Sequence, residues 1–324
     1  MKALITGGAG FVGFHLAKHL SRQGHTVVIA DNFQRGKKDG ELQQLLKQKN
    51  VKLATVDVTK EEDFSKLGDG YDWVFHFAAI NGTGNFYRIP DKVLKVGAVG
   101  TINILEWFAE KNSKGKLMLA SSSEAYAGMV KLLGRKFPIP TPEGVPLVIE
   151  DPSNARWSYA ASKILGEVAM FSYAKARNLG RFAVIRYHNI YGPRMGNEHV
   201  IPQFIQRIID REDPFTIHGG KPTRAFCYVD DAVRATQLVM ERDETNGQIV
   251  HIGRSDQEIR ISELAKELFK VTGFSPKVRL EEAPAGSAAR RCPDVSKLAK
   301  LGFRPEVPLT EGLKRTYEWY RDNQ

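Results

Sequence analysis

The sequence predicts an α/β protein in which a doubly wound parallel sheet is followed by a smaller C-terminal lobe. Short apolar runs, suited to strands buried on both faces, alternate with stretches of helical periodicity over residues 1–186. A run of glycines also lies between the first expected strand and the first expected helix. Because open parallel sheets bind ligands beyond the carboxyl ends of their strands, we look for functional residues in the loops that follow the strands.

The first expected unit is a strand at residues 2–6, a glycine-rich turn, and a helix at residues 11–22. The turn reads GGAGFVG, a fingerprint that carries meaning only in this strand-to-helix setting. Gly7 and Gly10 let the backbone turn tightly and approach a pyrophosphate at the helix N-terminus. Gly13 lets the helix pack close to the sheet. The unit therefore predicts a Rossmann-type dinucleotide site.

The second expected strand, residues 26–30, ends at Asp31. A carboxylate there accepts hydrogen bonds from an adenosine ribose and repels a 2′-phosphate, which favours NAD over NADP. The basic residues Arg35, Lys37 and Lys38 follow closely and weaken that preference.

Three more strands are expected at residues 51–56, 73–79 and 117–120. The first runs into Asp57 and Val58, which we expect near the adenine. The second contains His76, expected to be structural, and ends in the small pair Ala78 and Ala79, which leaves room for the cofactor. The third leads into Ser122, Ser123 and Glu124, which places them in the site. The expected NAD-binding residues are Gly7, Gly10, Phe11, Val12, Gly13, Asp31, Asn32, Asp57, Val58, Ala78, Ala79, Tyr159 and Lys163.

Tyr159 and Lys163 are four residues apart and share a face of an expected helix over residues 159–176. A tyrosine is a poor base near neutrality because its ordinary pKa is about 10, and a neighbouring ammonium favours the phenolate. We therefore expect Lys163 to lower the pKa of Tyr159 and to bind the nicotinamide ribose. Tyr159 would then take a proton from a secondary alcohol while hydride leaves for NAD.

Composition limits the alternatives. The chain has 324 residues, is 42% hydrophobic and 26% charged, and carries a net charge of +10. The basic residues are scattered among acidic ones, so we expect no nucleic-acid partner. No apolar stretch approaches the roughly 20 residues that span a membrane. Two distant cysteines, Cys227 and Cys292, suffice for neither a disulfide framework nor a zinc site, so we expect no metal and a cytoplasmic setting.

Taken together, the motifs resemble those of the extended short-chain dehydrogenase/reductases, in the nucleotide-sugar epimerase/dehydratase family. The resemblance covers nearly the whole chain. It implies an NAD-binding Rossmann domain at residues 1–186 with a return segment at 226–248. Residues 187–225 and 249–324 would form the lobe that binds a nucleoside diphosphate sugar. The resemblance further implies that a strand near residues 226–229 joins the parallel sheet of the Rossmann domain.

The resemblance also implies substrate contacts and an assembly. The segments RYHNIYGPR (186–194), TRAFCYVDD (223–231) and RRCPD (290–294) are similar to the family's C-terminal motifs. Guanidinium groups suit phosphate oxygens, in agreement with this assignment. A homodimer formed through a four-helix bundle is implied as well. The expected substrate-binding residues are Ser122, Arg156, Asn189, Val200, Arg224 and Arg291.

The reaction stays open between three routes that share oxidation at C4 of the sugar. Ser123 and Glu124 are similar to the pair that follows the catalytic serine in 4,6-dehydratases and uronate decarboxylases. Arg156 lies in a segment similar to the arginine-bearing segment of the decarboxylases. These features favour 4,6-dehydration or decarboxylation, with Ser122, Ser123, Glu124, Tyr159 and Lys163 as the catalytic set. The alternative is a 4-epimerase, and the alternative of another class is a non-catalytic NAD(H)-binding sensor.

Two departures from the family pattern concern the neighbourhood of the site. Gly97 replaces a common asparagine. The stretch 129–152 is rich in proline, which predicts an extended loop that lines the sugar pocket.

Overall fold

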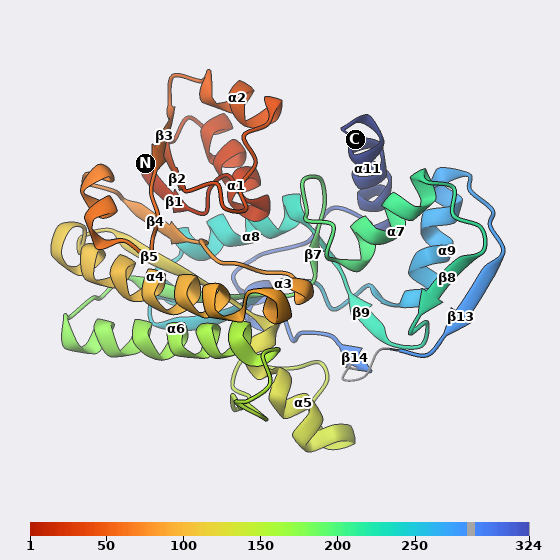
Figure 1. Cartoon of the computed structure of the whole chain (residues 1–324). Coiled ribbons are helices and arrows are strands. Elements are labelled where there is room, and N and C mark those ends of the chain that lie inside the picture. The colour runs from red at the N-terminus through yellow and green to blue at the C-terminus, as the bar shows by residue number, and fades with distance from the viewer. Residues whose placement is uncertain (284–288, 324) are drawn as a thin grey trace. The chain divides into compact units, whose positions relative to one another are not determined.

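The computed structural model describes residues 1–283 and 289–323. The chain forms two compact units, which are considered separately (Figure 1). Unit 1 comprises Met1–Gly128, Pro146–Arg186 and Val233–Val250. Unit 2 comprises Met129–Val145, Tyr187–Ala232 and His251–Gln324.

A central sheet organises the first unit. Within the described residues it has seven strands in the order β11-β6-β5-β4-β1-β2-β3, and the pairs β1–β2, β1–β4, β2–β3 and β4–β5 are parallel. The first two strands pair in register, from Lys2 opposite Thr26 to Thr6 opposite Ala30. The expected doubly wound sheet is confirmed. Its strands are β1 (Lys2–Thr6), β2 (Thr26–Asp31), β3 (Val51–Thr55), β4 (Trp73–His76), β5 (Lys116–Ser122), β6 (Phe182–Tyr187) and β11 (Gln248–Ile252).

Helices cover both faces of this sheet. His19 of α1 contacts Gln237 of α8 through a hydrogen bond of 2.7 Å, so these two helices are neighbours. The long helices α4 and α6 lie side by side on the other face (Figure 1). They approach closely because Gly97 has no side chain: a Cβ there would lie 2.6 Å from Cβ of Ser162. The helices named here are α1 (Phe11–Arg22), α4 (Pro90–Lys111), α6 (Trp157–Ala176) and α8 (Val229–Glu241).

Shorter elements complete this part of the chain. They are α2 (Gly40–Leu46), the 3-10 turn η1 (Glu61–Lys66), α3 (Thr83–Arg88), the 3-10 turn η2 (Ser123–Tyr126) and the 3-10 turn η4 (Asp243–Thr245).

The proline-rich stretch after the fifth strand differs from the expected extended loop. It begins with helix α5 (Ala127–Leu133) and the 3-10 turn η3 (Gly134–Lys136). The prediction overlooked that every proline of this stretch lies at or beyond Pro138, so the preceding residues are free to form helical turns. Residues 137–152 form neither a helix nor a strand, and Thr141 there makes an isolated bridge with Pro293.

Among the residues described, the second unit is built from short strands and helices. The expected strand near residues 226–229 forms as β10, but it pairs with β7 instead of joining the large sheet, whose corresponding edge strand is β11. The strands are β7 (Ile190–Tyr191), β8 (Phe215–His218), β9 (Thr223–Ala225), β10 (Cys227–Tyr228), β12 (Glu258–Arg260), β13 (Val278–Glu281) and β14 (Arg290–Arg291). The helices are α7 (Val200–Ile209), α9 (Ile261–Thr272), α10 (Ser296–Lys300) and α11 (Leu309–Asp322).

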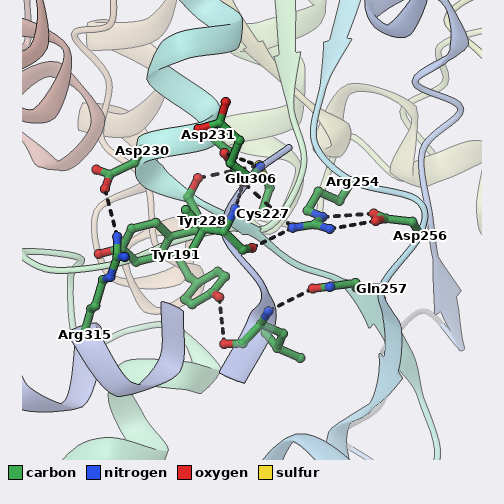
Figure 2. A network of polar contacts seen from close by, with 12 residues as sticks. Tyr191, Cys227, Tyr228, Asp230, Asp231, Arg254, Asp256, Gln257, Glu306 and Arg315 are labelled. Carbon is green, nitrogen blue, oxygen red and sulfur yellow. Dashed lines mark hydrogen bonds and ion pairs between the residues drawn. The ribbon is translucent and has the colours of Figure 1, made fainter. Parts of the chain in front are cut away.

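A buried polar network fixes the segment that leads into α11 (Figure 2). The carboxylate of Asp231 is fully buried and accepts hydrogen bonds from the backbone N–H groups of Glu306 (2.9 Å) and Val307 (3.0 Å). Arg254 donates to the carbonyl of Val307 (2.6 Å) and pairs with Asp256 through two hydrogen bonds. Within the segment 223–231, Asp231 therefore has a structural role.

Among the residues described, no helix is both long enough and apolar enough to cross a bilayer.

Candidate active site

The glycine turn has the geometry that a dinucleotide requires. Gly7 adopts φ +68°, and a Cβ there would lie 2.7 Å from the backbone nitrogen of Ala78. A Cβ on Gly13 would overlap the carbonyl oxygen of Gly7. Gly10 is the N-cap of α1, so no side chain caps the first N–H groups, and the first turn holds no acidic residue. This helix end thus fits a pyrophosphate, which prefers uncapped N–H groups and a positive dipole end.

Asp31 ends the second strand beside this turn. Its two carboxylate oxygens accept hydrogen bonds from the backbone N–H groups of Ala9 (3.0 Å) and Phe33 (2.8 Å). Burial raises the pKa of Asp31, and these two hydrogen bonds oppose the shift. The carboxylate is therefore held against the glycine turn, where NAD would place its adenosine ribose.

The expected adenine contacts are also held in place. The carboxylate of Asp57 accepts hydrogen bonds from the N–H (2.9 Å) and hydroxyl (2.8 Å) of Thr59. Val58 is buried against α4, where Asn103 donates to its carbonyl (3.0 Å) and Gly100 leaves room for its side chain.

The remaining residues expected to bind the cofactor also belong to unit 1. Phe11 and Val12 open α1, and Asn32 follows Asp31 directly. Ala78 and Ala79 follow the fourth strand and are partly exposed. Together with the glycine turn and Asp31, these residues fit NAD, which would supply a hydride acceptor to the site.

Tyr159, Lys163 and Ser122 come together at the carboxyl end of the fifth strand. Tyr159 and Lys163 are both 7% exposed and lie one turn apart on α6, with Nζ 5.5 Å from the tyrosine ring centroid. Lys163 Nζ donates to the carbonyl of Ala120 (2.8 Å). Tyr159 is hydrogen-bonded to Ser122, whose Oγ also accepts the N–H of Glu124 (3.2 Å). The structure thus brings these three expected residues together around one point.

The expected effect of Lys163 on the phenol is not the dominant one. Burial raises the pKa of Tyr159, and the negative charge of Glu124 adds to this, while the Ser122 hydrogen bond and the charge of Arg35 oppose it. Burial also lowers the pKa of Lys163 to about 8, and Glu167 opposes that shift. The prediction of a depressed tyrosine pKa was wrong for the protein alone, because it weighed the ammonium and left out desolvation.

Phe86 was not singled out by the sequence analysis. Its ring stacks on Tyr159 with centroids 5.0 Å apart and an interplanar angle of 10°, and it comes from α3. Ile80 and Val93 complete this apolar cluster. The cluster restricts the phenol ring and excludes water from one side of it. In the sequence, Phe86 is one apolar residue in the segment after the fourth strand. Such residues are too common to indicate a site by themselves.

His76 lies beneath the site and is fully buried. Its Nδ1 lies 2.8 Å from the hydroxyl of Thr6, and its Nε2 lies 3.3 Å from the hydroxyl of Thr101. Burial and the charge of Lys163 lower the pKa of His76 to about 3. The imidazole is therefore neutral and links β1, β4 and α4, which agrees with the structural role expected for it.

Glu124 and Arg156 form an ion pair of 3.7 Å at this site. Their side chains are 22% and 25% exposed, respectively, so the pair remains accessible to a ligand. Arg156 precedes α6 and Glu124 lies in η2, so Arg156 is close in sequence to Tyr159, and Glu124 is close to Ser122. Ser123, by contrast, is buried at 7% exposure.

In the second unit, the two expected phosphate-binding arginines are direct neighbours. Arg291 of β14 is the register partner of Arg224 of β9, and the strands are parallel. Register partners project from the same face of a sheet, so both side chains leave the sheet on one face. The guanidinium of Arg224 donates to the carbonyl of Thr223 (2.7 Å). On the opposite face Arg290 pairs with Glu258 through hydrogen bonds of 2.7 and 2.8 Å. Two adjacent cations on one sheet face suit a diphosphate.

Asn189 and Val200 lie in the same unit. Asn189 adopts φ +45°, a conformation uncommon for a residue other than glycine, and its amide donates to the carbonyl of Ala225 (3.0 Å). Val200 opens α7 and is partly exposed. The amide of Asn189 thus anchors the end of β9 next to Arg224. Among residues 1–283 and 289–323, no group of three or more potential metal ligands is present.

The fold and the Tyr-Lys-Ser site define an NAD-dependent enzyme of the nucleotide-sugar class, and the comparisons with known proteins agree. A sequence model of the "NAD dependent epimerase/dehydratase family" matches residues 3–253. The chain belongs to this family, and it is an NAD-dependent enzyme that modifies nucleotide sugars.

Relatives of several activities are similar over the whole chain. A UDP-N-acetyl-α-D-glucosaminuronate decarboxylase from Bacillus cytotoxicus is 35% identical and aligns over 99% of this chain and 98% of its own. The UDP-glucose 4-epimerase of Thermotoga maritima, solved with UDP-glucose, is 29% identical with a TM-score of 0.85, covering 99% of each chain. A UDP-glucuronic acid 4-epimerase mutant from Bacillus cereus, solved with a fluorinated UDP-glucuronic acid and NAD, is 26% identical with a TM-score of 0.86, covering 99% of each chain.

Proposed function

We propose that this enzyme decarboxylates a UDP-linked uronic acid through transient oxidation at C4 of the sugar. The observation that carries the proposal is the ion pair between Glu124 and Arg156, next to Ser122 and Tyr159. A guanidinium binds carboxylates through paired hydrogen bonds. Because Arg156 already holds one carboxylate at the edge of the site, a substrate carboxylate can take the place of Glu124.

The chemistry follows from the position of the carboxylate in a uronic acid. Tyr159 removes the C4 hydroxyl proton while hydride leaves C4, which gives a 4-keto sugar. The C6 carboxylate is then β to a ketone, so cleavage of the C5–C6 bond releases CO2 and leaves the electron pair as an enolate. Once the substrate carboxylate has replaced Glu124 on Arg156, Glu124 would take up a proton from solvent and pass it to C5. Return of the hydride to C4 and of the Tyr159 proton to the C4 oxygen completes the cycle.

The nucleotide diphosphate would be held by the arginine pair of the second unit. Arg224 and Arg291 lie on one face of the small sheet, and Arg290 is neutralised by Glu258 on the other. The choice of a UDP-linked uronic acid is supported by the relative of 35% identity, a decarboxylase of such a substrate. A UDP-glucuronic acid decarboxylase from Xenopus tropicalis, 31% identical over 99% of this chain and 72% of its own, supports the same class.

A second candidate is 4-epimerisation of a UDP-uronic acid. The Bacillus cereus structure of TM-score 0.86 belongs to such an epimerase and also binds a carboxylated sugar. Arg156 would serve that substrate equally well, so the fate of C6 decides between the two reactions. An epimerase keeps the carboxylate and needs no proton donor at C5.

Mass spectrometry of the product separates these reactions. The purified enzyme is incubated with NAD and, in separate reactions, UDP-glucuronate, UDP-N-acetylglucosaminuronate and UDP-glucose. Decarboxylation removes the mass of CO2, dehydration removes the mass of water, and epimerisation leaves the mass unchanged with a new NMR spin system. A mass change equal to water, or none with any uronate, contradicts the proposal.

The variant Glu124→Gln tests the proton donor. We expect it to form NADH and the 4-keto sugar but to lose at least about 100-fold in the completed conversion, the usual lower range for a positioned acid-base group. Glu110→Gln, an exposed carboxylate at the end of α4, is the matched control and should keep wild-type turnover. Full activity of Glu124→Gln would remove the proton-donor role and favour epimerisation.

We also propose that two copies of the chain associate through α4 and α6. Large apolar side chains are exposed on this helix pair, namely Leu94 (42%), Val99 (38%), Leu165 (40%), Val168 (60%) and Phe171 (38%). Several exposed apolar side chains on two neighbouring helices are typical of an interaction site. Light scattering should give a dimer for the wild type and a monomer for Val168→Glu, whereas Lys175→Glu, a charge change near the end of α6, should stay dimeric. A monomeric wild type contradicts this assembly.

A further inference from the structure

Behind the catalytic trio lies a buried ion pair that the reaction as described does not use. Glu167 of α6 and Arg186 of β6 form two hydrogen bonds of 2.8 and 2.7 Å, and their side chains are 4% and 2% exposed. Ser121 Oγ donates to the same carboxylate (2.5 Å). Breaking a buried pair of this kind is costly, so these three side chains have little freedom to move.

The carboxylate of this pair is one helical turn beyond Lys163. Tyr159, Lys163 and Glu167 are spaced i, i+4 and i+8, so they form one row along α6. Ser121, which donates to Glu167, directly precedes Ser122, the partner of Tyr159. The network therefore lies next to Lys163 on α6 and next to Ser122 at the end of β5.

Lys163 needs support for its charge because its surroundings are dry. It faces Tyr159 on α6, the neutral His76 on β4 and the carbonyl of Ala120 on β5. Arg186 on β6 is a second cation in this buried region, while Glu124 of η2 acts on Tyr159. Glu167 is thus the carboxylate that offsets the desolvation of Lys163, whose pKa burial lowers to about 8.

We propose that Glu167 is a positioning residue that keeps Lys163 protonated and, through Ser121, fixes the strand end that presents Ser122. The carboxylate does not touch substrate in this account; it acts through its two neighbours. Arg186 orients Glu167 and limits how strongly its charge acts on Lys163. The inference rests on C4 oxidation by Tyr159 and Lys163, whichever reaction follows.

The pH dependence of kcat/KM tests the electrostatic part. Loss of the Lys163 proton should define the alkaline limb, because neutral Lys163 supports neither the phenolate nor the ribose. Glu167→Gln removes the offsetting charge and leaves Arg186 in place, so the limb should move toward lower pH by about one unit or more, the scale of a charge a few ångströms away at an effective dielectric near 20. Arg186→Met should move the limb the opposite way.

A double variant tests the order in which the alkaline limbs of the variants fall along the pH scale. Glu167→Gln/Arg186→Gln removes both charges and keeps two hydrogen-bonding amides, so its limb should fall between those of the wild type and Glu167→Gln. If Arg186→Met does not accumulate as folded protein, the double variant alone supplies the comparison. If the pair had only a structural role, all variants would be less stable, and the pH of the alkaline limb would not differ between them in this order. Glu106→Gln, an exposed carboxylate on α4, is the control and should leave the limb unchanged.

A second readout does not depend on turnover. The dissociation constant of NADH is measured by NADH fluorescence across the same pH range. As the pH rises, NADH binding should weaken in both enzymes, and in Glu167→Gln it should begin to weaken at a lower pH than in the wild type. Coincident pH profiles for both enzymes, in kcat/KM and in NADH binding, overturn the proposal. Full turnover of Tyr159→Phe would instead contradict C4 oxidation by Ser122, Tyr159 and Lys163. That result differs from coincident pH profiles, which contradict only the role of Glu167.

Discussion

Replacing Tyr159 with phenylalanine removes one oxygen atom and leaves the packing of the site intact. The ring stacks on Phe86 at 5.0 Å with an interplanar angle of 10°, and phenylalanine can make the same stack. The hydroxyl loses its hydrogen bond with Ser122, which is worth about 1 kcal/mol of stability in a typical case. We therefore expect the folded state to survive with a small change in melting temperature.

Turnover should respond far more strongly than stability. Tyr159 is the only group proposed to take the C4 hydroxyl proton, and a positioned acid-base group contributes at least about 100-fold, or about 2.7 kcal/mol of activation free energy. Binding of NAD and nucleotide sugar should change little, because the glycine turn and the arginine pair are untouched.

The assay combines stopped-flow NADH fluorescence with product analysis. Tyr159→Phe should show no transient NADH and less than about one hundredth of wild-type product. The control is Phe86→Leu, which disturbs the stack but keeps the hydroxyl and should retain measurable turnover. Wild-type rates in Tyr159→Phe would refute the assignment of the base.

Three further predictions concern stability. Lys116 begins β5 and is fully buried, and its Nζ donates to the carbonyls of Val239 (3.1 Å) and Arg242 (2.6 Å) at the end of α8. Lys116→Met should therefore cost on the order of 1–3 kcal/mol in chemical denaturation, while Lys114→Met, at an exposed position, should cost almost nothing. Burial lowers the pKa of Lys116 from 10.5 to about 8, so between these pH values the unfolded chain binds more protons than the folded chain. The free energy of unfolding of the wild type, relative to Lys116→Met, should therefore increase as the pH rises through this window. A difference that does not change with pH contradicts this. Gly97→Ala should cost about 1–3 kcal/mol because its Cβ would collide with α6, whereas Gly84→Ala meets open space and should be tolerated.

The parts of this protein that the sequence revealed are those set by local pattern. The strand at residues 2–6 and the helix at residues 11–22 form with the expected bounds because apolar periodicity and glycine placement decide them. Tyr159 and Lys163 were found for the same reason, since spacing on one helix fixes their common face. The family match then carried the expectation to Arg224 and Arg291.

Features that depend on tertiary contact were missed or misjudged. Phe86 reaches Tyr159 only because two segments distant in sequence pack together, and Glu167 meets Arg186 across a helix and a strand. The pKa of Tyr159 is raised because burial, which no local pattern reports, outweighs nearby charge. The strand at Cys227–Tyr228 was assigned to the wrong sheet because its short apolar run fits either one.

The most direct test of the central claim is mass spectrometry of the wild-type enzyme with NAD and UDP-N-acetylglucosaminuronate, run beside UDP-glucuronate. The account predicts that at least one of the two loses the mass of CO2, and that Arg156→Gln greatly slows this loss while the control Arg177→Gln, an exposed arginine beyond α6, does not. A product that retains its carboxylate in both reactions, with a changed configuration at C4, would contradict decarboxylation and establish the epimerase.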